Sequence, residues 1–346
     1  MHQATLQLPT HRDLESVLKF AKELDYYAMH DKLVIDLGER ATFLSPFVLL
    51  FIAAKLKALR EKSPELQLEF RHSREHFYAA HMAFFRMCGI DHGREIGETG
   101  TDNCVPITCV DKSSLYVKAT DNYEELPDLV QRHADTLARM IARAPGENDD
   151  MFDALSYSIR EVMRNVFEHS QTSSLHCCAQ YWPRSNKVEF AIADFGIGIR
   201  RGLGENPNFR FKRDKEAIEY SLLPSVSGKT HLPRRSETWF NSGYGLYMTN
   251  RLARNGGNFV LASGETAIHL SRKTKHNYAT SFPGTVLRFN LDVNEIGSVQ
   301  ARLQQFRKEG AEIAKRIAGS GNRPPSAMSL LLRRDYSSQP YMRHRT

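Results

Sequence analysis

In the N-terminal part of this chain, the spacing of apolar residues changes between a strand-like and a helix-like period. These changes predict an order of strands and helices. Leu33–Leu37 and Leu66–Phe70 are short apolar or alternating runs, which predict strands. Between them, Phe43–Pro46 leads into the apolar segment Phe47–Leu56, and an aromatic-rich stretch follows from His76 to Met87; both segments predict helices. This order predicts an α/β domain over residues 1–105.

A longer amphipathic segment lies in the middle of the chain. Glu161, Asn165 and His169 are spaced four residues apart, so on a helix they project from one face. A separate apolar face is supplied by Met163, Val166 and Phe167. The spacing therefore predicts a helix that presents a carboxylate, an amide and an imidazole together.

Three glycine-containing motifs follow this helix. The apolar run Val188–Ala193 predicts a strand that ends at Asp194, and Gly196 and Gly198 come directly after it. Further along, Gly243 and Gly245 precede a predicted helix that begins near Leu246, and Gly284 and Thr285 lead into a third apolar run. Glycine permits backbone conformations and close approaches that a side chain would block. A glycine turn that enters a helix also offers N–H groups to phosphate.

The helix and the three motifs, in this order over residues 125–293, resemble the nucleotide site of the GHKL superfamily of ATPases. That superfamily includes gyrase B, Hsp90-type chaperones, MutL and histidine kinases. The resemblance implies the Bergerat fold, an α/β sandwich, for residues 120–295. It also implies ATP and Mg²⁺ as cofactors.

The resemblance assigns a role to each matching residue. Asn165 corresponds to the magnesium ligand, and Glu161 to the general base that acts on water or on a protein hydroxyl. Asp194 corresponds to the acceptor of the adenine amino group, with Thr285 beside it. The remaining residues assigned to the nucleotide are His169, Gly196, Gly198, Gly243, Gly245 and Leu246.

The segment from Arg200 to Asn241 is predicted to form the ATP lid, since it is rich in basic residues, glycine, serine and proline. It contains Ser227-Gly228-Lys229-Thr230, which imitates the end of a P-loop. A P-loop requires glycine where Leu223 stands, so we reject that interpretation. Lys229 is still expected to reach the γ-phosphate from the lid.

Within the GHKL superfamily, the chain is most similar to anti-sigma-factor serine kinases, and residues 5–100 resemble STAS domains, the fold of the antagonists of those factors. STAS antagonists carry a phosphorylated serine at the start of a helix. In the register that the pattern favours, Pro46 takes the place of that serine, and Ser45 lies one residue before it. Ser45 is therefore either a phosphorylation site or, more commonly for Ser before Pro, a helix N-cap. The predicted fold class is α/β (α+β): a STAS-like domain, a Bergerat domain, and a basic helix and tail over residues 296–346.

Composition sets further limits. The chain has 346 residues, room for two domains, and its longest apolar stretch, Phe43–Ala54, is 12 residues. A membrane span needs about 20 residues, so we expect no membrane partner. The five cysteines are odd in number and form no C-x-x-C motif, which favours a reduced, cytoplasmic location. From residue 301 onward there are ten basic and three acidic residues, which accounts for the net charge of +7.

These features predict an ATPase or a protein serine/threonine kinase that acts on a partner protein, which docks on the STAS-like domain or the tail. One alternative is a non-catalytic switch in which ATP only changes partner binding. A second is a nucleic-acid-associated ATPase that uses the basic tail. GHKL ATPases and STAS domains often work as pairs, so a homodimer also fits the resemblance.

Overall fold

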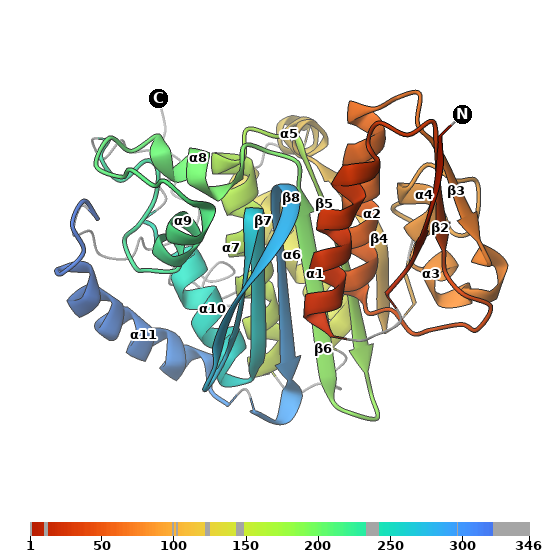
Figure 1. The fold of residues 1–346 in the computed structure, drawn as a ribbon. Coiled ribbons are helices and arrows are strands. Elements are labelled where there is room, and N and C mark those ends of the chain that lie inside the picture. Colours follow the sequence, from red (N-terminus) through yellow and green to blue (C-terminus); the bar gives the residue numbers. More distant parts are fainter. Residues whose placement is uncertain are drawn as a thin grey trace.

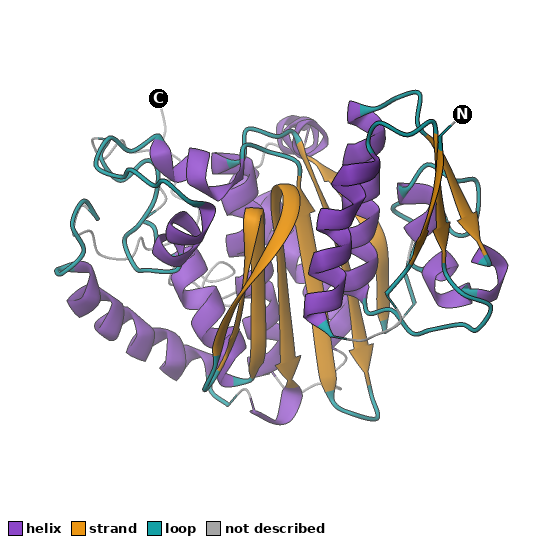
Figure 2. Cartoon of the chain, in the orientation of Figure 1, coloured by secondary structure: helices purple, strands orange, loops and turns teal. Residues whose placement is uncertain are grey.

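The computed structural model describes residues 2–9, 13–98, 100–101, 103–121, 125–142, 149–232, 242–295 and 297–320. These residues form a mixed α/β fold with one parallel and one antiparallel sheet (Figures 1 and 2). The fold class predicted from the sequence is thereby confirmed.

The first sheet has three parallel strands in the order β1-β2-β3. They are β1 (Gln3–Gln7), β2 (Lys32–Asp36) and β3 (Gln67–Arg71). Parallel strands need crossover connections, which are helices α1 (Leu14–Glu23) and α2 (Pro46–Lys62), with a short 3₁₀ helix, η1 (Leu24–Tyr27), after α1. The two strands predicted here are displaced by one residue from those observed.

The aromatic helix predicted from His76 to Met87 is not continuous. After the 3₁₀ helix η2 (Ser73–Glu75), the structure has two short helices, α3 (Phe77–His81) and α4 (Phe84–Met87). Ala83 between them has a left-handed backbone conformation, with φ of 61°. The break allows Phe84 and Phe85 both to be buried, and each ring makes an edge-to-face contact with Phe70.

The second sheet has five antiparallel strands in the order β4-β5-β6-β8-β7. The strands are β4 (Cys104–Asp111), β5 (Ser174–Trp182), β6 (Lys187–Asp194), β7 (Gly257–Ser271) and β8 (Lys275–Asp292). The domain boundary predicted at residue 105 falls inside β4, so the chain enters this sheet at Cys104.

Helices cover both faces of the five-stranded sheet. On one face lie α6 (Leu126–Ala142), α7 (Asp149–His169) and α10 (Gly245–Asn255). On the other face lie α1 and α2, which the three-stranded sheet covers in turn (Figure 1). The remaining elements are α5 (Lys112–Asp121), α8 (Gly198–Gly204), α9 (Asp214–Ser221), η3 (Val293–Glu295) and α11 (Val299–Ala314). The N-terminal segment thus shares a core with the second sheet.

A buried carboxylate joins the N-terminal segment to the five-stranded sheet. Glu189 of β6 is 3% exposed, and its Oε1 accepts a hydrogen bond of 2.9 Å from the backbone N–H of Phe47, in the first turn of α2. Arg288 of β8 lies 3.9 Å from the other carboxylate oxygen, and its guanidinium lies over the Phe47 ring. Ser45 is the N-cap residue by position, but its hydroxyl makes no capping hydrogen bond. Glu189 therefore caps the start of α2, which is the role predicted for Ser45.

Two further observations bear on the sequence predictions. In the described part of the chain, no helix combines the length and the apolar character needed to cross a membrane. All five cysteines are free thiols, and only Cys109 is exposed.

Replacing the carboxylate of Glu189 is expected to destabilise the protein. Glu189→Ala leaves the Phe47 N–H and the Arg288 guanidinium buried without this partner, which costs about 2–4 kcal/mol. Glu189→Gln keeps an acceptor oxygen and should lose less. Urea denaturation of the two variants measures the difference, and equal stability of Glu189→Ala and wild type would contradict the capping role.

Candidate functional site

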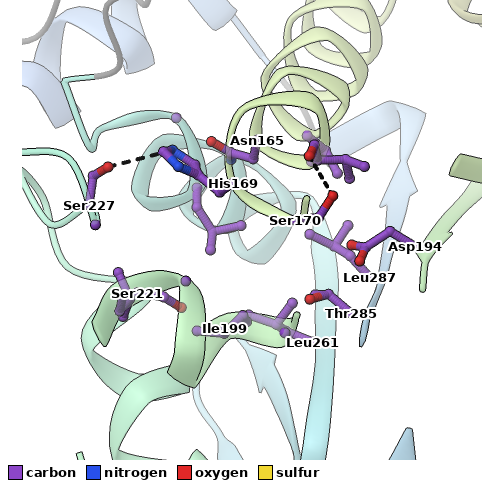
Figure 3. A pocket seen from close by; sticks show the side chains of 18 of the residues that line it. Asn165, His169, Ser170, Asp194, Ile199, Ser221, Ser227, Leu261, Thr285 and Leu287 are labelled. Atoms are coloured by element: carbon purple, nitrogen blue, oxygen red, sulfur yellow. Dashed lines mark hydrogen bonds between the residues drawn. The ribbon is translucent and has the colours of Figure 1, made fainter. Parts of the chain in front are cut away.

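The ends of α7 and β6, the middle of β8 and the start of α10 border a pocket of about 850 Å³, counting the space at its open mouth (Figure 3). Eight residues singled out from the sequence line it: Asn165, His169, Asp194, Gly198, Gly243, Gly245, Leu246 and Thr285. Three others do not: Glu161, Gly196 and Lys229. The motifs that are far apart in sequence therefore converge on one cavity.

Asp194 is the buried acid of this pocket. It is the last residue of β6, pairs in register with Thr285 of β8, and is 3% exposed. Its Oδ1 accepts a hydrogen bond of 2.8 Å from the backbone N–H of Gly196. Burial raises the pKa of Asp194 to about 7, although hydrogen bonds from the backbone of Gly196 and Thr285 oppose the shift. A donor that binds this carboxylate would favour its ionised form.

The walls around Asp194 and Thr285 are largely apolar. They are formed by Val162, Val166, Ile192, Ile199, Leu203, Val226, Leu261 and Leu287. Figure 3 shows Leu261 and Leu287 close to Asp194 and Thr285, with Ile199 beside Leu261. An apolar cavity with a few polar groups at fixed positions is typical of a site for a planar organic ligand. These wall residues carry no motif, so sequence reasoning missed them.

The start of α10 brings backbone into the pocket, and two glycines make this approach possible. Gly243 has φ of +74°, and a Cβ atom there would lie 2.6 Å from the backbone N of Val226. A Cβ atom on Gly245 would lie 2.4 Å from Oε2 of Glu161. The N-cap residue Tyr244 supplies no side-chain hydrogen bond to the helix. The helix N-terminus can therefore offer backbone N–H groups and its positive dipole end to an anion.

Asn165 and His169 extend from the last turns of α7 toward the pocket. His169 Nε2 lies 3.5 Å from Oγ of Ser227. Burial lowers the pKa of His169 to about 3, with the charges of Lys229 and Arg164 as smaller causes, so the imidazole is neutral near pH 7. Among the described residues, no cluster of three His, Cys, Asp or Glu side chains could hold a metal. Asn165, to which the sequence assigned magnesium, lines the pocket and carries a side-chain oxygen, the kind of ligand that magnesium prefers.

Glu161 lies beneath the start of α10. It is fully buried, and its carboxylate forms ion pairs with Arg160 at 3.0 Å and with Arg164 at 3.2 Å. Gly245 covers it on the pocket side. The carboxylate predicted to be the general base is therefore separated from the cavity in this conformation.

The predicted lid divides into described and undescribed parts. Residues 233–241, including Asn241, lie outside the described residues. In the described part, Ser227 and Gly228 line the pocket, whereas the Lys229 ammonium donates to the carbonyl of Glu168, 2.9 Å away. Of the P-loop-like segment, the serine and glycine thus contribute to the wall, and the lysine binds the C-terminal end of α7.

Comparisons of this chain with protein-family models, with curated proteins and with solved structures found no match.

The raised pKa of Asp194 predicts how stability changes with pH. The folded protein retains a proton, with a pKa of about 7, that the unfolded chain loses near the ordinary value of 3.8. This contribution is fully present below pH 3.8 and is lost as the pH rises through about 7. Between these values the slope is about 1.4 kcal/mol per pH unit.

Urea denaturation of the wild type and of Asp194→Asn at a series of pH values measures this contribution. The stability of the wild type relative to the variant should fall as the pH rises from 4 to 7, the window between the two pKa values. Parallel profiles would show that the pKa of Asp194 is not raised.

Proposed function

We propose that this protein is a GHKL-type regulator that binds ATP, with Mg²⁺, in the pocket between α7, β6, β8 and α10. The observation that carries the proposal is the pairing of two chemistries in one cavity. A buried carboxylate, Asp194, lies among apolar walls, and a helix N-terminus with glycines at positions 243 and 245 borders the same space. A nucleotide base with an amino group fits the carboxylate and the apolar walls, and phosphates fit the helix N-terminus.

Each lining residue then has a definite task. Asp194 accepts a hydrogen bond from the adenine amino group, and Thr285 supports it from the adjacent strand. The N–H groups around Gly245 and Leu246 bind phosphate oxygens. Asn165 contributes a side-chain oxygen to magnesium, whose charge offsets that of the phosphates. The neutral His169 is suited to hydrogen bonding and not to charge neutralisation.

The geometry favours a nucleotide-gated switch over catalysis as the principal activity. Glu161 is fully buried, ion-paired with two arginines and covered by Gly245, so its carboxylate does not line the cavity, as a general base for a bound nucleotide would have to. Phosphoryl transfer, as an ATPase or a serine/threonine kinase, is the second candidate. It is favoured by the position of Glu161 one helical turn before Asn165, and it requires α10 to move.

The partner that such a switch controls is expected to be a protein. We infer that the switch itself operates in the cytoplasm, where its five free thiols would stay reduced. Residues 321–346, on which the nucleic-acid alternative depends, lie outside the described residues. A partner can contact the protein through the exposed surfaces of the N-terminal segment.

Asp194→Asn is expected to weaken ATP binding. The variant loses a charge-assisted hydrogen bond, worth about 1.5–3 kcal/mol, so affinity should fall by about one to two orders of magnitude. Asp36→Asn is a matched control, because Asp36 also accepts from a backbone N–H two residues on, that of Gly38, but at the end of β2. Titration calorimetry with Mg-ATP measures both; equal losses in the two variants would contradict the assignment.

Glu161→Gln separates the switch from the enzyme when label is followed from γ-labelled ATP. The switch predicts that wild type and variant bind ATP alike and that neither releases labelled phosphate nor becomes labelled. Glu168→Gln serves as the control, because Glu168 also pairs with Arg164, whereas the carboxylate that Gly245 lies against is that of Glu161. Transfer by wild type and by Glu168→Gln that is lost only in Glu161→Gln would make the protein an enzyme.

A further inference from the structure

The C-terminal helix α11 is docked on the molecule along its whole length. Its buried positions are Val299, Leu303, Phe306, Gly310 and Ala314. Arg251 of α10 forms an ion pair with Glu309, and its guanidinium lies 4.5 Å from the centre of the Phe306 ring. Figure 1 shows α11 beside α10, on the side away from the five-stranded sheet. The helix therefore packs against the element that begins the proposed phosphate site.

One position of α11 touches both segments that flank the pocket. A Cβ atom added to Gly310 would lie 2.9 Å from the ring of Tyr247, 3.0 Å from the ring of Tyr244 and 3.3 Å from Cβ of Pro224. Tyr244 is the residue between the two phosphate-site glycines, and Pro224 begins the turn that continues into the pocket wall. A small residue at position 310 thus lets α11 lie directly against both segments.

The turn that follows α11 makes a second contact with the wall. Ser225 is fully buried, and its hydroxyl donates a hydrogen bond of 2.8 Å to the carbonyl of Ser320. The hydroxyl of Ser320 in turn donates to the carbonyl of Ala314, which holds the turn at the helix end. Ser225 has φ of +62°, a left-handed conformation that residues other than glycine adopt when their surroundings impose it.

These contacts lie one residue away from the pocket lining. Val226, Ser227 and Gly228 follow Ser225 directly and line the cavity. On the other side, Gly243 packs against the backbone of Ser225 and Val226, since a Cβ atom there would lie 2.8 Å from the carbonyl carbon of Ser225. The turn that begins at Pro224 therefore lies between Gly243 and the residues that follow α11.

We propose that α11 and the turn after it hold the pocket wall at residues 226–228 in its binding position, with Ser225 and Gly310 as positioning residues. The proposal rests on the proposed nucleotide function for its consequence: docking of α11 raises ATP affinity, and ATP reciprocally stabilises docking of α11.

Ser225→Ala tests the first contact, because it removes the hydrogen bond to Ser320 and leaves the backbone in place. ATP affinity should fall about fivefold, the effect of one hydrogen bond. Thr280→Val is the matched control, since Thr280 also donates a buried hydroxyl to a distant carbonyl, that of Leu18, on the other face of the sheet. Its melting temperature should fall, whereas its ATP affinity should equal that of wild type.

Gly310→Ala tests the second contact by pushing α11 away from Tyr244 and Pro224, and it should weaken ATP binding at least as much as Ser225→Ala. Amide hydrogen exchange in nucleotide-free protein gives a readout that does not depend on ATP. Exchange across residues 222–230 should be faster in both variants than in wild type and Thr280→Val.

These measurements distinguish the positioning role of α11 from the proposed binding of ATP. Unchanged exchange across the wall in both variants overturns the positioning role, whatever ATP does. Faster exchange together with wild-type ATP affinity also overturns the positioning role, because the wall would then be irrelevant to binding. That result would not affect the proposed function. If wild type binds no Mg-ATP, the proposed function fails, and the exchange measurement alone decides whether α11 holds the wall.

Discussion

The five-stranded sheet must bury both of its faces, and the rest of the structure follows from how it does so. Its strands are largely apolar on both sides, with Phe190 and Phe289 fully buried on one face and Ala191 and Val286 on the other. Helices α6, α7 and α10 cover the first face, and α1 and α2 cover the second. The N-terminal segment is thus a structural layer of the sheet. The buried Glu189, bound to the start of α2, fixes how that layer sits.

This sandwich also explains why the pocket forms where it does. Strand β6 ends at Asp194, which pairs with Thr285 inside the longer strand β8, and α7 and α10 approach this pair from the same face. A carboxylate held there is removed from water, which raises its pKa to about 7 and makes it sensitive to any donor that enters. The proposed site therefore has a buried carboxylate acceptor and a helix N-terminus, with an apolar space between them.

The parts of the site that could be predicted from sequence are those defined by local chemistry. Asp194 ends a strand and Gly243 precedes a helix, as predicted, and the structure gathers both around one pocket. Thr285 also lines the pocket, but it lies inside β8 and does not lead into a strand. The pocket walls were missed because apolar residues such as Leu261 and Leu287 look alike in any strand.

Contacts between distant residues were missed for another reason. The bond from Phe47 to Glu189 joins positions 142 residues apart, and that from Ser225 to Ser320 joins positions 95 apart, so no local pattern reveals either. Glu161 shows the converse limit. Its spacing from Asn165 follows from the helix, but its burial beneath Gly245 depends on where α10 lies. Spacing predicts which residues share a face, whereas tertiary packing decides what that face meets.

In the proposed site, Asp194 accepts a hydrogen bond from the amino group of adenine. The most direct test compares the affinities of the wild-type protein for ATP and for inosine triphosphate, which carries a carbonyl oxygen where adenine carries the amino group. The account predicts that ATP binds about 100-fold more tightly, because the carbonyl would face the carboxylate without a hydrogen to share. Equal affinity for the two nucleotides, or no binding of either, would contradict it.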